Sequence, residues 1–447
     1  MKLGALWLAL VICGLAQAQP LAFNQALDLA LKSPSLEIAR LQAELAHRQL
    51  EVAASPLSAE LTAGFSATWG TIDAPGLPEP RSLDDRSWDP FALTTAFNVV
   101  PLGPRFDRLQ RARFNLLRAE QALRDERARL LLETTRHYLN ALRATEQAAL
   151  AERQLALAQN TLAATQARQE AGAVTAAQLL QSEIAVSRAH SQIADAERAK
   201  AAALALLSLS VGATVSSVAG EPPMAAAPPT GDLGQLAERS DVLAARLALA
   251  EAELTASSTL RDNLPSGSLS LSYARQQGER RLALGAGFDT RSYQPSLSLS
   301  FDPDAALAGN LPDATSSSFR LGISARVPLD AALPAALQAA ALAVEQASLQ
   351  LTLAINRAEL ELNNRQREVE AAEAALGLSE QVLAQSRRVA QDTEARYALG
   401  LVSSLERDQA ELSAAEAELA AARARDGVLL ARLALAAALA LDPLEIF

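Results

Sequence analysis

The chain has 447 residues, of which 50% are hydrophobic, so it is long enough for two or three domains with a sizeable core. Only 10 Phe, 4 Tyr and 3 Trp are present, and the apolar half is mainly Ala and Leu, a composition typical of long, closely packed helices rather than of globular enzymes. Acidic residues exceed basic residues by 51 to 40, and the net charge of −11 disfavours binding to a phosphate backbone, so no nucleic-acid partner is expected.

Residues 1–18 have the pattern of a secretory signal peptide. A lysine precedes an apolar run, and the small residues Ala16 and Ala18 indicate cleavage after Ala18. The single cysteine, Cys13, lies in this segment, and a lipid anchor at Cys13 is the less favoured alternative, because the residue before it is bulky. We therefore expect an exported chain without disulfides, and no later apolar run is long enough for a membrane-spanning helix.

A helical segment follows at about 21–54, with Ser33 and Pro34 as the N-cap and first residue of a helix. Two stretches, at about 60–69 and 91–100, then alternate between apolar and polar residues, which is the periodicity of strands.

Two long helices are predicted next. Neither glycine nor proline occurs between Pro104 and Gly172, and a helix over 104–171 would be about 100 Å long at 1.5 Å per residue, too long for a compact domain. A second such stretch predicts a helix over 174–211, and its heptad-spaced apolar residues indicate coiled-coil packing.

The second half of the chain repeats the first. Residues 167–175 match residues 395–403 at an offset of 228, whereas Arg40-Leu41 matches Arg246-Leu247 at an offset of 206, which places an insertion of about 20 residues in the second copy. We divide the chain into the leader, a first repeat, a Pro-rich linker and a second repeat, at 1–18, 19–219, 220–231 and 232–447. The second repeat contains a helical segment at about 233–261, strands at about 268–274 and 319–327, and long helices at about 334–399 and 402–441.

The four strand segments favour a membrane sheet over a soluble, half-buried one, which alternates in the same way. Most aromatic residues lie in or beside them, as in the girdles of membrane barrels, and their polar side is mainly Ser, Thr, Gly and Arg, which suits a wet lumen. Four strands cannot close a barrel, so several chains would share one. Residues 281–301 also alternate like strands; either they extend a hairpin outside the membrane or one spanning strand is assigned wrongly.

The order and duplication of these elements resemble a TolC-type outer-membrane efflux protein, or outer membrane factor. The resemblance covers the mature chain and includes the turn at 395–403, Pro101-Leu102-Gly103, and Pro328-Leu329-Asp330, each Pro-Leu segment leading from strand back into helix. It implies an α+β membrane protein with a long α-helical coiled-coil barrel and a shared transmembrane β-barrel. It also implies a homotrimer in outer-membrane lipid, with four strands from each chain in a 12-stranded barrel.

The resemblance further implies a function and its partners. The trimer would be the exit duct of a tripartite efflux or type I secretion system. A periplasmic adaptor (membrane fusion) protein and an inner-membrane pump or ABC exporter would supply the other stages. The turns at Gly172 and Gly400 would lie at the periplasmic tip, where the adaptor docks, and glycine there suits a reversal that needs positive φ. The neighbouring docking contacts would be Val174, Thr175, Val402 and Ser403.

Gating members of this family have a Tyr before the second glycine, an Arg after it and two acids soon afterwards. Tyr397 matches, but the Arg position is Val402, and the acid positions are Glu406 and Gln409, which argues against a tightly latched gate. Three copies of Glu406 around a threefold axis would form a carboxylate ring that favours cations. Asp408 is a rival for this role, and a solvated helix face is the alternative for either acid.

Two other functions share part of this pattern. A periplasmic coiled-coil adaptor would lack the duplicated strand hairpins, and a structural envelope spacer would require no barrel. No enzyme is expected, because the sequence contains no nucleophile elbow, phosphate loop or metal motif. No cofactor or metal is expected either, since His47, His137 and His190 are too far apart for a ligand motif.

Overall fold

The computed structural model describes residues 20–72, 81–97, 103–226, 238–278, 280–303, 315–327 and 331–442. The predicted leader with Cys13, most of the later half of the predicted linker, Pro101-Leu102 and Pro328-Leu329-Asp330 lie outside these residues. The chain forms two compact units. The helical unit comprises Met1–Gln42, Glu120–Leu243 and Leu353–Phe447, and the sheet unit comprises Ala43–Ala119 and Ala244–Thr352.

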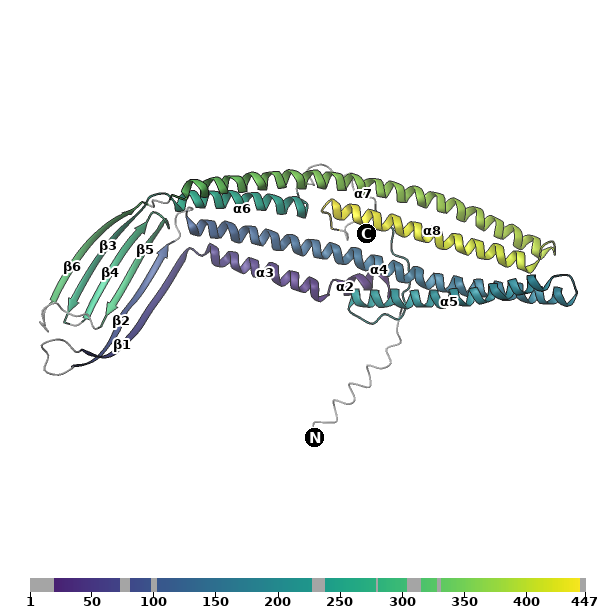
Figure 1. The fold of residues 1–447 in the computed structure, drawn as a ribbon, viewed down its shortest axis with the longest axis horizontal. Coiled ribbons are helices and arrows are strands. Elements are labelled where there is room, and N and C mark those ends of the chain that lie inside the picture. Colours follow the sequence, from purple (N-terminus) through teal and green to yellow (C-terminus); the bar gives the residue numbers. More distant parts are fainter. Residues whose placement is uncertain are drawn as a thin grey trace, which may run out of the picture. The chain divides into compact units, whose positions relative to one another are not determined.

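The predicted long helices are present (Figure 1). α4 and α7 have 67 and 66 residues, and α4 begins at Pro104, where the missing N–H of proline costs no helix hydrogen bond. The predicted segment 21–54 is two helices, and the second begins at Pro34, as the sequence indicates. No described helix is both long and apolar enough to cross a membrane. The helices are α2 (Phe23–Ala30), α3 (Pro34–Ala54), α4 (Pro104–Glu170), α5 (Ala176–Val211), α6 (Ser240–Asp262), α7 (Leu333–Ala398) and α8 (Ser404–Ala438).

The sheet unit contains one antiparallel sheet of six strands in the order β1-β2-β5-β4-β3-β6 (Figure 1). The four predicted strands are all present, but the expectation of four strands per chain is wrong. Residues 281–301 form a further hairpin, β4 and β5, that pairs between β2 and β3, so the segment adds two strands to the sheet. The strands are β1 (Leu57–Ile72), β2 (Arg81–Phe97), β3 (Ser266–Gln277), β4 (Arg280–Asp289), β5 (Gln294–Asp302) and β6 (Thr315–Arg326).

The main core of the helical unit joins α2, α4 and α5 to the segment that follows α5. The ring of Tyr138 lies edge-on to Phe23, with centroids 5.3 Å apart, and both side chains are buried. Leu207 and Val211 of α5 and Val218 beyond it complete the contact. The hydrophobic effect therefore fixes the segment after α5 on the surface of α4.

Candidate functional site

Both long-helix pairs reverse direction at a glycine. Gly172 follows α4 and Gly400 follows α7, with φ of 70° and 71°. The glycine N–H groups donate to the carbonyls of Gln169 at 2.8 Å and Tyr397 at 2.9 Å, and each following N–H reaches five residues back, which is the Schellman motif. A Cβ at either glycine would meet no atom within 4 Å, so the backbone conformation, and not lack of space, requires glycine.

The helices after the two turns begin with matching capping boxes. Gln178 N donates to Thr175 Oγ1 at 3.4 Å, and Thr175 N donates to Gln178 Oε1 at 2.9 Å. Ser403 and Glu406 make the same pair of bonds at 3.3 and 2.9 Å. One oxygen of Glu406 thus binds the backbone. The spacings Thr-x-x-Gln and Ser-x-x-Glu signal this role in the sequence, but it is not among the predictions made above.

The turn surfaces expose several of the predicted docking residues. Thr175 and Ser403 are exposed, whereas Val174 and Val402 are half-buried. The most exposed apolar side chains at the second turn are Leu399 and Leu401, at 74% and 70%. The predicted docking contacts do not include these two leucines, because only small residues beside the turns were assigned this role.

Tyr397 interacts with a residue that the sequence analysis did not single out. The guanidinium of Arg407 lies 4.6 Å from the ring centroid of Tyr397, a cation–π contact between α7 and α8. Arg407 also binds Asp408, with Nη2 2.6 Å from Oδ1, and this hydrogen bond raises the pKa of Arg407 above its ordinary value. Asn160 of α4 donates to the other oxygen of Asp408 at 3.2 Å. Arg407 and Asp408 of α8 together therefore join α8 to α7 and α4 near the second turn.

The four constriction candidates consequently differ in their surroundings. Asp408 is held between Arg407 and Asn160, and Tyr397 is stacked under Arg407. Glu406 and Gln409 are both exposed on the first turns of α8. The structure thus brings Tyr397 and Asp408 together through Arg407, and it leaves Glu406 as the exposed acid of the predicted set.

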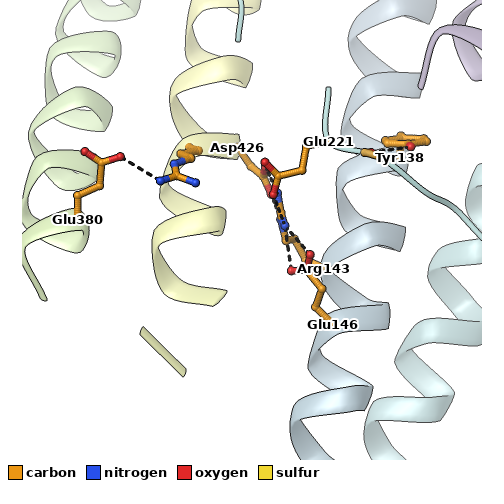
Figure 2. A network of polar contacts seen from close by, with 8 residues as sticks. Tyr138, Arg143, Glu146, Glu221, Glu380 and Asp426 are labelled. Carbon is orange, nitrogen blue, oxygen red and sulfur yellow. Dashed lines mark hydrogen bonds and ion pairs between the residues drawn. The ribbon is translucent and has the colours of Figure 1, made fainter. Parts of the chain in front are cut away.

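A buried arginine connects α4, α8 and the segment after the first repeat (Figure 2). Arg143 donates to both oxygens of Asp426, at 2.7 and 3.0 Å, and also to Glu146 and Glu221. Its side chain is 8% exposed. Burial lowers the pKa of Arg143, but the hydrogen bonds to Asp426 and Glu146 outweigh burial, so the pKa is raised above its ordinary value. The network fixes Glu221, at the start of the predicted linker, against two long helices.

Tyr138 fixes the residues just before Glu221. Its hydroxyl lies 2.7 Å from the carbonyl oxygen of Ala219 and 2.9 Å from that of Gly220. Burial raises the pKa of Tyr138 above its ordinary value, so the neutral phenol is retained as a donor. The beginning of the predicted linker is therefore a docked segment.

Polar contacts line both sides of α8. Towards α4, Glu416 accepts from Gln154 and Arg423 donates to Gln147, at 3.0 and 2.8 Å. Towards α7, the ion pairs are Arg387 with Glu418, Arg425 with Glu380, and Arg432 with Glu373. α8 thus lies between α4 and α7, as the view in Figure 2 also shows.

The two faces of the sheet differ in chemistry. One row of register partners crosses all six strands and consists of large apolar side chains, each between 40% and 72% exposed. This apolar row comprises Phe319, Tyr273, Leu284, Leu299, Leu93 and Leu61. The neighbouring row, which we call the small row, lies on the other face and comprises Ser318, Ala274, Ala283, Ser300, Ala92 and Thr62. Large exposed apolar side chains on one face suit contact with lipid, and small side chains, half of them Ser or Thr, suit contact with water.

Known proteins share this fold. The chain resembles the CmeC outer membrane channel of Campylobacter jejuni, with 16% identity, a TM-score of 0.68, and coverage of 93% of this chain and 85% of that one. It resembles the outer membrane protein VceC of Vibrio cholerae, with 18% identity, a TM-score of 0.64, and coverage of 93% and 95%. It also resembles the open MtrE outer membrane channel of Neisseria gonorrhoeae, with 19% identity, a TM-score of 0.65, and coverage of 94% and 88%.

The sequence itself gives the family. No curated protein sequence matches the chain significantly. Residues 26–213 and 235–441 match the family described as outer membrane efflux protein, and together they make up most of the chain. The match favours the exit duct over the adaptor and the spacer. The chain therefore belongs to the outer membrane efflux protein family, whose members serve as outer-membrane exit ducts with a helical tunnel in the periplasm.

Proposed function

We propose that three copies of this chain form one passive duct, which receives solutes from an inner-membrane pump or ABC exporter through a periplasmic adaptor. The observation that carries the proposal is the open amphipathic sheet. Within the described residues, β1 and β6 are the edges of a six-stranded sheet, and the smallest closed barrels have eight strands. Unpaired edges are not stable in a bilayer, so further copies must supply the missing pairs. The duct needs no catalytic residue or cofactor.

The proposal includes the division of the chain into two repeats, at 19–219 and 232–447, joined at 220–231, with residues 1–18 as the export signal. The two turns support this division, because the Schellman bonds and the capping boxes recur with the same offset of 228 positions. The separate family matches at 26–213 and 235–441 agree with it.

The adaptor is proposed to dock on the two helix turns. Gly172 and Gly400 set the backbone there, with Val174, Thr175, Val402 and Ser403 beside them, and the exposed Leu399 and Leu401 add an apolar contact. Tyr397, Glu406, Asp408 and Gln409 are proposed to line the periplasmic constriction. Glu406 is the better candidate for a carboxylate ring, because Asp408 is already paired with Arg407.

The test uses the full chain expressed in a Gram-negative host. We expect it in the outer-membrane fraction, with a native mass of three chains in mild detergent, and we expect discrete ion-conducting openings after reconstitution into planar bilayers. A monomeric periplasmic species without channel activity would contradict the proposed function.

A further inference from the structure

The inserted hairpin of β4 and β5 is part of the wall of the sheet. Every residue of β4 is paired with β3, from Ser268 opposite Asp289 to Gln277 opposite Arg280. On the other flank, β5 pairs with β2 from Phe91 opposite Phe301 to Ala96 opposite Ser296. Such pairing on both sides distinguishes a spanning hairpin from a loop folded over a finished sheet.

The chemistry of the two faces continues through the insertion without a break. Leu284 and Leu299 occupy the apolar row between Tyr273 of β3 and Leu93 of β2. Register in a sheet decides which face each side chain meets, so a hairpin outside the bilayer would have no reason to extend this exposed apolar row. The inserted strands therefore meet the same lipid as their neighbours.

The polar face of the insertion has small residues along its middle, between the pairs Arg281–Asp302 and Asp289–Gln294 at the strand ends. Gly285 and Gly287 of β4 lie beside the hydroxyls of Ser298 and Ser296 of β5, and a Cβ on Gly287 would lie 3.0 Å from Ser296 Oγ. Ser300 and Ala283 continue this lining. Small side chains on the face that encloses the lumen leave the space across it open.

The turn between β4 and β5 is fixed to the rest of the sheet unit. Thr290 N donates to the carbonyl of Gly267 at 2.9 Å, and Gly267 N donates to Thr290 Oγ1 at 2.7 Å. Arg291 donates to the carbonyl of Asp262 at the end of α6, at 2.8 Å. Gly103, with φ of 88°, passes so close to Ser292 that a Cβ would lie 2.9 Å from its carbonyl oxygen.

We propose that the trimeric barrel has 18 strands, six from each chain, and that β4 and β5 widen the outer exit of the duct. This inference rests on the proposed trimer. Because all neighbouring strands are antiparallel, β1 and β6 also run in opposite directions and can join edge to edge between copies. Barrel diameter grows roughly linearly with strand number, so 18 strands enclose about twice the cross-section of 12, and barrels of 16 to 18 strands contain an aqueous channel. The barrel thus admits bulkier solutes than four strands per chain would allow.

Disulfide trapping in the full chain tests the strand order in the membrane. In this sheet Ala92 and Ser300 are register partners, and neighbouring strands place Cα atoms about 5 Å apart, within reach of a disulfide. Ala274 lies three strands from Ala92, about 14 Å at 4.8 Å per strand, beyond that reach. If β4 and β5 lay outside the barrel, β2 and β3 would be neighbours and Ala92 would approach Ala274 instead.

We expect the pair Ala92→Cys with Ser300→Cys to oxidise within one chain in outer-membrane vesicles, and the pair Ala92→Cys with Ala274→Cys to stay reduced. The pair Thr62→Cys with Ala92→Cys, partners in β1 and β2, is the positive control. The proposal is overturned if the control pair forms and the Ala92–Ser300 pair does not, or if the Ala92–Ala274 pair forms. The native mass distinguishes failure of the 18-stranded barrel from failure of the proposed function. A trimer that forms the Ala92–Ala274 disulfide contradicts only the widened barrel, whereas a mass other than three chains contradicts the proposed function.

Discussion

Glu406 combines two roles at one position, a helix cap and an exposed carboxylate. The change Glu406→Gln removes the charge and keeps the cap, because Gln178 makes the same two hydrogen bonds at the first turn. We expect the cation preference of single channels to fall, with the reversal potential in a salt gradient moving towards zero. Glu183→Gln, an exposed acid on α5, is the control. An unchanged reversal potential, or an equal change in the control, contradicts a ring at Glu406.

Asp426 compensates the buried charge of Arg143. We expect Asp426→Ala to destabilise the helical unit by about 3 kcal/mol, because removing one partner leaves a buried guanidinium incompletely paired. Glu418→Ala is the matched control, since its pair with Arg387 is about half exposed and should change stability by less than about 1 kcal/mol. Thermal unfolding followed by circular dichroism in detergent measures both. Equal midpoints for the two variants would show that burial of the pair has no energetic effect.

Tyr138 makes stability depend on alkaline pH. Because its pKa is raised by burial in the folded protein, the unfolded state loses the proton first as the pH rises. The contribution of Tyr138 to the free energy of unfolding is complete below about pH 10, the ordinary pKa of tyrosine. It is lost as the pH rises past the raised pKa of the folded protein. We expect Tyr138→Phe to cost about 1 kcal/mol at neutral pH, through the lost bonds to Ala219 and Gly220, and to reduce the loss of stability at alkaline pH. Urea titrations at pH 7 and pH 11 measure the free energy of unfolding of both proteins. An equal fall between the two pH values in the original protein and the variant would contradict the role of Tyr138 in the alkaline loss of stability.

At the scale of the elements, glycine stabilises a turn between two helices but destabilises the interior of a helix. Gly400 has positive φ, whereas Gly377 lies inside α7 with open space around it. Gly400→Ala should destabilise the α7–α8 turn by about 1 kcal/mol, because a Cβ is strained in the left-handed conformation. Gly377→Ala should stabilise α7 by about 0.5–1 kcal/mol. Unfolding midpoints give the sign of each change, and a gain from Gly400→Ala would exclude the left-handed turn.

The elements of the helical unit are held by apolar and ionic contacts of unequal value. α8 pairs with α7 through exposed ion pairs, which contribute little individually because water screens them. Alanines such as Ala414, Ala417 and Ala421 are buried on the same helix and permit close approach of its neighbours. Small residues therefore account for the packing, and the charges keep the remaining faces soluble.

At the scale of the whole molecule, the two faces of the sheet determine how the protein enters a membrane. Leu299 and Ser300 are adjacent in β5 but lie on the apolar and small rows respectively. Leu299→Arg should impair insertion, because a lipid-facing Arg costs about 2–4 kcal/mol at the bilayer midplane. Ser300→Arg should insert normally and shift the channel towards anion preference. Outer-membrane yield and reversal potential measure the two effects, and normal insertion of Leu299→Arg would assign that face to water.

The sequence by itself determined the elements and the family. Glycine and proline spacing located the first pair of long helices, because these residues interrupt helices for local reasons, and the internal repeat located the second pair. Alternation located the four predicted strands, because side chains alternate between the faces of a strand. Gly172 and Gly400 were identified as turns for the same local reason.

Only the tertiary structure decided which distant residues meet. Alternation in 281–301 indicated strands, but a strand period does not specify partners, so the place of this hairpin between β2 and β3 required the folded sheet. The sequence likewise could not predict the contacts of Arg407 with Tyr397 and of Arg143 with Asp426, because a charged residue on a helix gives no sign of its partner on another helix. Local conformation depends on neighbours in sequence, whereas sheet order and buried ion pairs depend on contacts between segments far apart in the chain.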